Sequence, residues 1–230
     1  MNTTKSILAV LAGGCLLAAS ARSHAGEVML KGAQVGQWTM DFDAAAKLAE
    51  EKKLPMMLNF TGSDWCGWCK LMEEGVFADN QWKNFASENV VLVTLDFPRD
   101  KTIVPEKYVE RNNALKDQFG VRGYPTYIIL DSDGETKIGQ LGAGQDKTPA
   151  SFIEEFKGTV RLSDTSIAAY VEANPEKADA YKQAVAEMKA AEKELEDWIA
   201  TQPERNEENI EKFNALQKQI KEANEALNEF

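Results

Sequence analysis

The chain has 230 residues, of which 43% are hydrophobic and 27% are charged, and its formal net charge is −11. This composition is that of a folded globular protein with a real core, which excludes a disordered chain and a peptide-sized scaffold. An acidic surface repels nucleic acid and anionic membranes, so neither is expected as a partner.

The first 25 residues have the features of an export signal. Lys5 gives a positive start, residues 7–19 are almost all apolar, and residues 23–25 (Ser-His-Ala) have small side chains at the two positions that a signal peptidase reads. We predict that residues 1–25 are a cleaved signal peptide, that the protein is periplasmic or secreted, and that it has no stable membrane insertion after cleavage. An uncleaved anchor and lipidation at Cys15 are the alternatives, although the apolar run is short for a membrane span.

Residues 38–160 alternate between helical and strand periods. The apolar runs at 54–61 and 90–97 have the length and composition of buried strands. Residues 126–130, the Asp-Ser-Asp-Gly turn signal that follows, and a strand near 136–141 predict a β-hairpin. Helices are predicted at 43–53, from Cys66 onward, at 80–89, at 106–119 and at 149–160. The order βαβ, helix, hairpin, helix is typical of an α/β sheet covered by helices on both faces.

Residues 175–230 differ in composition, because they contain no Gly and are dominated by Ala, Glu, Lys, Gln and Asn. Apolar residues recur at alternating spacings of three and four over 184–198 and again over 213–230, which is the pattern of a coiled-coil seam. Between the two runs, Thr201 and Glu204 have the spacing of a capping box, which predicts the start of a new helix. We therefore predict two helices folded back as an antiparallel hairpin.

The chain thus divides into three predicted parts. They are a signal peptide (1–25), an α/β domain (26–162) and a C-terminal helical, coiled-coil extension (163–230). Two interpretations of the extension remain open, because its helices either pack on the first domain or serve in dimerisation or partner docking.

Removal of the predicted signal changes the chemistry that the chain can perform. The only His, His24, leaves with it, and of three cysteines only Cys66 and Cys69 remain. Catalysis by His and metal sites that contain His are therefore excluded. A disulfide between cysteines three positions apart closes too small a loop to stabilise a fold, so we interpret the pair as reactive.

Cys66 and Cys69 stand at the start of a predicted helix. There the first sulfur lies beside unpaired backbone N–H groups at the positive end of the helix dipole, which favours thiolate over thiol. Cys66 is therefore the predicted nucleophile. Cys69, almost one turn later, is predicted to be covered by the chain and to reach back to close the disulfide. Gly67 and Trp68 add no cation to this site, whereas Lys70 could add one.

Two segments resemble the thioredoxin superfamily. They are residues 65–70 (Trp-Cys-Gly-Trp-Cys-Lys) and residues 120–126 (Gly-Val-Arg-Gly-Tyr-Pro-Thr), the second followed directly by a predicted strand. The resemblance covers about residues 38–160 and is nearest to exported bacterial thioredoxin-like proteins and to the soluble domains of thiol:disulfide interchange proteins. It implies a thioredoxin-like fold with a central mixed sheet and helices on both faces. The C-terminal helical hairpin lies outside it.

The resemblance also implies roles for single residues. Pro125 is predicted to be cis and to place the Tyr124 backbone against the Cys66 sulfur, where it pairs with a substrate strand and keeps metal off the thiols. Cys66 would attack a substrate disulfide and Cys69 would resolve the mixed disulfide, or the reverse sequence would oxidise a substrate. No cofactor or metal is expected. The remaining residues predicted to shape the substrate surface are Trp65, Gly67 and Trp68.

The chain departs from the family at two positions. Thioredoxins keep a buried acid on the strand before the cysteines to move the proton of the second thiol, and the nearest counterpart here is Asn59, which does not titrate. We expect Asp64, Glu73 or water to take its place. Trp68 stands where oxidising members often have His, and it cannot supply the cation that makes a disulfide oxidising. We therefore predict a thiol–disulfide oxidoreductase that leans towards reductase or isomerase activity.

Two other functions remain open. A Cys-x-x-Cys pair can bind copper(I), which would make the chain a copper delivery protein. Alternatively, the pair is a structural disulfide in a non-catalytic binding module whose acidic hairpin does the binding. For an oxidoreductase, the expected partners are protein thiols and disulfides of exported proteins together with a redox partner protein. Dimerisation through the hairpin would bring two active sites to a shared cleft, which would favour isomerase activity.

Overall fold

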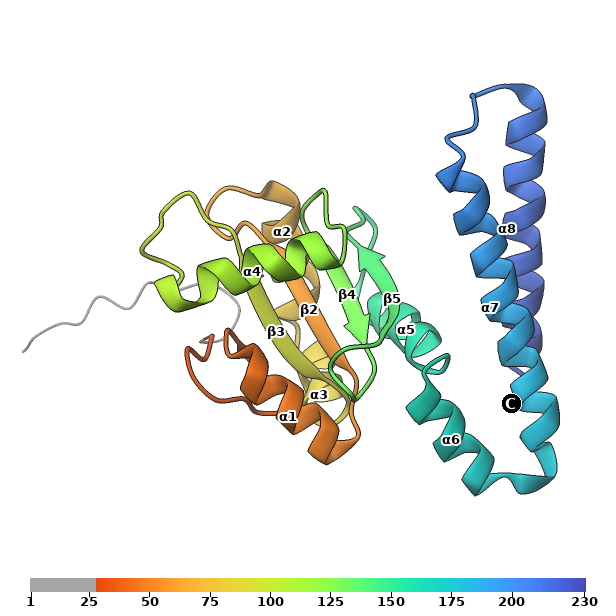
Figure 1. Ribbon diagram of the computed structural model, residues 1–230, viewed down its shortest axis with the longest axis horizontal. Coiled ribbons are helices and arrows are strands. Elements are labelled where there is room, and N and C mark those ends of the chain that lie inside the picture. The colour runs from red at the N-terminus through yellow and green to blue at the C-terminus, as the bar shows by residue number, and fades with distance from the viewer. Residues whose placement is uncertain (1–27) are drawn as a thin grey trace, which may run out of the picture.

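The computed structural model describes residues 28–230 and has a five-stranded sheet at its centre; the predicted signal peptide (1–25) lies outside the described residues. The strands lie in the order β1-β3-β2-β4-β5 (Figure 1). Their bounds are β1 (Trp38–Thr39), β2 (Met56–Thr61), β3 (Val91–Asp96), β4 (Thr126–Leu130) and β5 (Lys137–Gly142). β3 pairs in parallel with β1 and β2, whereas β4 pairs antiparallel with β2 and β5, which confirms the predicted mixed sheet.

Helices cover both faces of this sheet, as predicted. Side chains alternate across β2, so that Met57 joins one hydrophobic cluster while Met56 and Leu58 join the other. Helices α2, α3 and α5 cover the first cluster, and α1 and α4 cover the second. Their bounds are α1 (Phe42–Lys52), α2 (Gly67–Met72), α3 (Asn80–Asn89), α4 (Glu106–Gln118) and α5 (Pro149–Val160). Every residue of β2, β3 and β4 is buried, which explains why these strands are apolar runs in the sequence.

A π-helical turn, η1 (Glu73–Phe77), follows α2 directly. Its last residue, Phe77, is buried, and the centre of its ring lies 5.3 Å from the ring centres of Trp82, Tyr127 and Phe152. Edge-on aromatic contacts of this kind add to the stabilisation that comes from apolar burial. The helix that begins at the cysteines is therefore anchored in the core at its other end.

The predicted helices and strands of the sheet domain agree with the structure to within two residues at their ends. Three short elements were not predicted, namely β1, α6 (Asp164–Ala173) and the single turn η2 (Pro175–Lys177). β1 has two residues and is held only by pairing with β3, so it has no periodicity of its own to detect. α6 has no fully buried residue, so its apolar pattern is weak.

Beyond α6, two long helices form the predicted hairpin. α7 (Ala178–Ala200) and α8 (Glu207–Leu227) lie side by side and extend away from the sheet (Figure 1). A separate hydrophobic cluster joins Leu162, Tyr181, Val185 and Leu227, so the end of α5 is tied to the hairpin through its own core. None of the helices described within residues 28–230 has the combination of length and hydrophobicity that a bilayer-spanning segment requires.

The capping box predicted at Thr201 and Glu204 is wrong. The Thr201 hydroxyl donates to the carbonyl of Trp198 at 2.6 Å, so it closes the end of α7. Gln202 then adopts a left-handed conformation with φ of 52°, which reverses the chain. The N-cap of α8 is Asn206, whose side-chain oxygen accepts the backbone N–H of Asn209 at 2.8 Å.

Candidate active site

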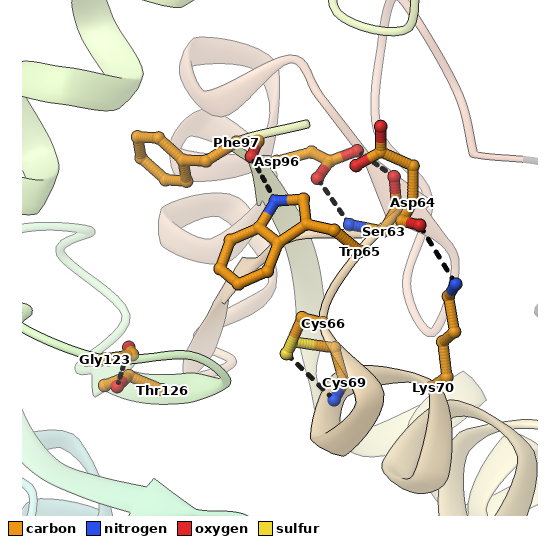
Figure 2. The surroundings of a disulfide bond; sticks show 10 residues. All are labelled: Ser63, Asp64, Trp65, Cys66, Cys69, Lys70, Asp96, Phe97, Gly123 and Thr126. Carbon is orange, nitrogen blue, oxygen red and sulfur yellow. Dashed lines mark hydrogen bonds between the residues drawn. A yellow bond between two sulfur atoms is a disulfide. The ribbon is translucent and has the colours of Figure 1, made fainter. Parts of the chain in front are cut away.

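Cys66 and Cys69 form a disulfide at the N-terminus of α2 (Figure 2). Cys66 is the N-cap residue of this helix, and its Sγ accepts the backbone N–H of Cys69 at 3.1 Å. The exposed fractions of Cys66 and Cys69 are 5% and 7%. The predicted position of the pair at a helix start is therefore confirmed. After reduction, the same N–H groups and the helix dipole would stabilise a thiolate on Cys66.

The loop before Cys66 is tied to the end of β3. Because β2 and β3 are parallel, with Thr61 in register with Asp96, the segments that follow both strands begin at the same edge of the sheet. The Asp96 carboxylate accepts the backbone N–H of Ser63 at 2.9 Å and its hydroxyl at 2.6 Å. Burial raises the pKa of the Asp96 carboxyl, although the bonds from Ser63 oppose the shift. Asp96 therefore positions the loop that leads into Cys66.

Asp64 makes the reciprocal connection. Its carboxylate accepts the backbone N–H of Asp100 at 2.9 Å and that of Arg99 at 3.0 Å. The N–H of Asp100 is the largest cause of the lowered pKa of Asp64. The Lys70 ammonium donates to the carbonyl oxygen of Asp64 at 3.1 Å, so this cation lies against the same loop. The loops before Cys66 and after β3 thus hold each other in place (Figure 2).

Trp65, the first residue of the 65–70 motif, contacts the 120–126 motif through Tyr124. Its indole N–H donates to the carbonyl of Phe97 at 2.9 Å, and its ring centre lies 5.7 Å from that of Tyr124, edge-on. A Cβ atom at position 62 would come within 2.4 Å of this ring, so Gly62 is required there. The contact between Trp65 and Tyr124 confirms that the segment around Pro125 lies beside the segment around Cys66.

The peptide bond between Tyr124 and Pro125 is cis, as predicted. Pro125 is buried, and Thr126, which begins β4, donates its hydroxyl to the carbonyl of Gly123 at 2.9 Å. Tyr124 is half-buried and packs against Phe97 as well as Trp65. This loop is therefore supported from the sheet and from the loop after β3.

The other predicted substrate contacts lie on the exposed side of α2. Trp68 has an exposed fraction of 50%, and Leu71, which was not among the predicted contacts, one of 43%. Gly67 is exposed at the first helical position, and a Cβ atom there would meet no other atom within 4 Å, so packing does not require glycine. Two large apolar side chains next to a buried disulfide form a surface that a partner can cover.

Of the two acids expected to replace the missing buried acid, the structure favours Glu73. Asn59 is buried, and its Oδ1 has no hydrogen-bond partner within residues 28–230. Glu73 is half-buried four residues after Cys69, with one carboxyl oxygen also unpartnered within the described chain. Burial raises its pKa to about 7, against an opposing effect of Lys83. Asp64 is exposed, and its lowered pKa makes it a poor proton acceptor.

Asn59 projects to the face of the sheet that α2 and η1 cover, because it lies on the same face of β2 as Met57. Asn59 is opposite Tyr127 in the pairing of β2 with β4. Burial raises the pKa of the Tyr127 hydroxyl, and the charge of Glu73 adds to the shift. The helix that begins at Cys66 is thus followed directly by a half-buried acid whose pKa is raised to about 7.

Sequence reasoning missed Asp96 and the loop that Asp64 holds, because the partners are 33 to 36 residues apart. The one indication in the sequence was that Asp96, an acid, ends a strand that is otherwise mostly apolar. Within residues 28–230, no group of three or more His, Cys, Asp or Glu side chains is placed to hold a metal ion.

The chain matches the family model of the thioredoxin-like domain over residues 42–156, which is half of its length. It belongs to the thioredoxin-like family. The disulfide bond reductase DsbH of Chlamydia pneumoniae is 29% identical over 157 residues, which cover 65% of this chain and 93% of DsbH. The thioredoxin-related protein DsbJ of the same organism is 27% identical over 111 residues, which cover 48% of this chain and 31% of DsbJ.

A solved structure of a DsbH oxidoreductase also resembles this thioredoxin-like chain. The TM-score is 0.51 and the identity 28%, and the match covers 60% of this chain and 96% of the other. Together with the Cys66–Cys69 disulfide, these relatives identify the protein as a thioredoxin-like thiol–disulfide oxidoreductase.

Proposed function

We propose that this protein is an exported reductase of protein disulfides. The observation that carries the proposal is the Cys66 sulfur at a helix N-terminus, where it accepts a backbone N–H beside the loop that contains Tyr124 and Pro125. The name of DsbH, a disulfide bond reductase, supports this direction of electron flow. So does Trp68, which supplies no cation to stabilise the thiolate.

In the proposed reaction, the Cys66 thiolate attacks one sulfur of a substrate disulfide. The substrate S–S bond breaks, its other sulfur leaves as a thiolate that takes up a proton, and a mixed disulfide with Cys66 forms. The Cys69 thiolate then attacks the Cys66 sulfur, which releases the second substrate thiolate and forms the Cys66–Cys69 disulfide. Two electrons have passed from the protein to the substrate. A dithiol redox partner must then reduce the pair again.

Glu73 is the proposed acceptor of the Cys69 proton in the second step. It follows Cys69 by four residues, so both side chains lie on one side of the helix. Its pKa of about 7 is suited to accepting a proton at neutral pH. Trp65, Gly67, Trp68 and Tyr124 are proposed to contact the substrate, and the Tyr124 backbone next to Pro125 is proposed to pair with an extended substrate strand.

The reduction potential tests the proposed direction. We expect the Cys66–Cys69 pair to equilibrate with glutathione at a potential near about −270 mV, the value of a reducing member, rather than about −120 mV, that of a strong oxidant. Trp68→His supplies the missing cation and serves as the matched variant, with an expected shift towards a more oxidising potential. A wild-type value near that of the oxidant, or a pair that cannot be reduced, would contradict the proposal.

Export is the second element of the proposal. Its support is the pattern of residues 1–25, and the expected mature protein begins at residue 26 and lacks Cys15. Intact mass measurement of the protein isolated from the periplasm or the medium checks this directly. A full-length mass, or a mass increased by a lipid on Cys15, would instead indicate an uncleaved anchor or a lipoprotein.

The proposed division places the chemistry in residues 26–162 and leaves the helical extension, 163–230, without a catalytic role. Its support is that the DsbH structure is matched over 96% of its own length by 60% of this chain. Homodimerisation through the hairpin, and with it isomerase activity, stays a prediction. Ile199 and Ile210 near the tip of the hairpin are exposed, which is the feature that a dimer interface would use.

A further inference from the structure

The loop after β3, residues 97–103, is a fixed part of the active-site surface. Asp64 holds the backbone N–H groups of Arg99 and Asp100, and Trp65 holds the carbonyl of Phe97, as Figure 2 shows for Trp65. Inside the loop, the Asp100 carboxylate accepts the N–H and the hydroxyl of Thr102 at 2.9 and 2.7 Å. A loop bonded both to itself and to the segment before Cys66 presents its side chains in a defined place.

Arg99, a basic side chain of this loop, lies over the ring of Trp65. Its guanidinium carbon lies 5.7 Å from the centre of the Trp65 ring, and Trp65 directly precedes Cys66. A guanidinium over an aromatic face loses some of its freedom before a ligand arrives. Arg99 and Lys101 are exposed, and neither forms an ion pair within the described part of the chain.

The charge around the cysteines differs from that of the whole chain, which carries −11. The basic side chains on the elements that surround the disulfide are Lys70, Arg99, Lys101 and Arg122. The nearby acids Asp64 and Asp100 are ionised, but their carboxylates accept backbone N–H groups rather than pairing with these side chains, and Asp96 is buried against Ser63. A substrate that approaches Cys66 therefore meets cations that form no ion pair within residues 28–230, of which Lys70 and Lys101 donate to backbone carbonyls.

We infer that Arg99, supported by Lys101, is a specificity-determining residue that selects protein disulfides flanked by acidic side chains. A guanidinium binds a carboxylate through two parallel hydrogen bonds. Because Arg99 is exposed, we expect it to act mainly on the rate at which the substrate associates and on the orientation in which it binds. The inference rests on the proposed function, since it concerns the substrates of the same disulfide exchange. It adds the substrate class that this active site accepts best.

Short peptides closed by one internal disulfide test the inference. Three peptides are identical except that Glu, Gln or Lys stands on each side of one cysteine, and the second-order rate constant of their reduction by the pre-reduced protein is measured in a single turnover. We expect the Glu peptide to be reduced about five-fold faster than the Lys peptide at low salt.

This ratio should fall towards one in Arg99→Gln, because the guanidinium is then absent. It should also fall at high salt, because salt screens an exposed ion pair. Arg205→Gln, the same change at an exposed position in the linker between α7 and α8, should retain the ratio.

Each contrary outcome identifies what failed. Equal rates for the three peptides with the wild-type protein would overturn the inference and leave the proposed function intact. An Arg99→Gln variant that slows all three peptides and keeps the ratio would also overturn it, because the residue would then act on Cys66 rather than on the substrate. No reduction of any peptide by the reduced wild-type protein would overturn the proposed function and the inference together.

Discussion

Replacing Cys66 with Ser is expected to abolish disulfide reduction, whereas replacing Cys69 with Ser is expected to preserve the first step and to accumulate the mixed disulfide. Only the Cys66 sulfur is the N-cap of α2 and accepts a backbone N–H there. A serine hydroxyl in that place is not ionised and does not attack sulfur, so the rate should fall by at least about a thousand-fold. Thiol release from a peptide disulfide measures the loss, and mass spectrometry of the Cys69→Ser protein detects the trapped adduct.

The control for this prediction is the position of the adduct. Cys66→Ser keeps Cys69 as the one cysteine after signal removal and should trap no adduct, whereas Cys69→Ser should carry the substrate on Cys66. Full activity in Cys66→Ser would contradict the assignment of Cys66 as the nucleophile. No disulfide reduction by the reduced wild-type protein would favour the alternative of a non-catalytic binding module. Tight binding of copper(I) by the reduced wild-type protein, without reductase activity, would favour the copper delivery alternative.

Glu73→Gln is expected to slow the resolution of the mixed disulfide by about a hundred-fold at neutral pH and to remove a step near pH 7 from its pH profile. The proposed reason is that the carboxylate, with its pKa of about 7, takes the proton of Cys69. Rapid-mixing measurements on a preformed mixed disulfide isolate this step from the first attack. Glu74→Gln is the matched control, because Glu74 is the exposed neighbour. It should keep the rate and the step, with the step moved to lower pH because the charge of Glu74 contributes to the raised pKa of Glu73.

The same variant is expected to be more stable than the wild type above neutral pH. Burial raises the pKa of Glu73 from 4.5 to about 7, so between these values the folded protein holds a proton that the unfolded chain has released. Stability therefore falls as the pH rises through this window, and the deficit is complete above about pH 7. Gln avoids this loss, which is worth about 1–3 kcal/mol at pH 8. Equal denaturation midpoints at pH 8, or an unchanged rate of resolution, would contradict the role assigned to Glu73.

Much of the fold could be predicted from the sequence because its central strands are buried on both faces. β2, β3 and β4 are short apolar runs for that reason, and several helices of the domain carry their own caps, such as Thr148 at the start of α5. β1 was missed because two residues paired to one neighbour leave no pattern. Thr201 and Glu204 have the spacing of a capping box but do not form one. The Thr201 hydroxyl instead donates to the carbonyl of Trp198, at the end of the preceding helix.

In the candidate site, too, the features that depend on neighbouring residues were predicted, and those that depend on tertiary contacts were not. The position of Cys66 at a helix start follows from residues within one turn, and the cis bond at Pro125 was implied by the family motif around it. The choice between Asp64 and Glu73 as the acid was open from the sequence, because it depends on burial. Backbone N–H groups from another loop bond to Asp64, whereas burial raises the pKa of Glu73.

The sequence by itself determined the sheet and its covering helices, the hairpin of two helices and the cysteine pair at a helix N-terminus. All of these depend on local periodicity, capping and spacing. Only the tertiary structure decided that Asp96 bonds to Ser63 and that Asp64 fixes Arg99 beside Trp65. These contacts arise because β2 and β3 are parallel neighbours in a register that sets Thr61 beside Asp96. Strand order and register are properties of the assembled sheet, and no short stretch of the chain contains them.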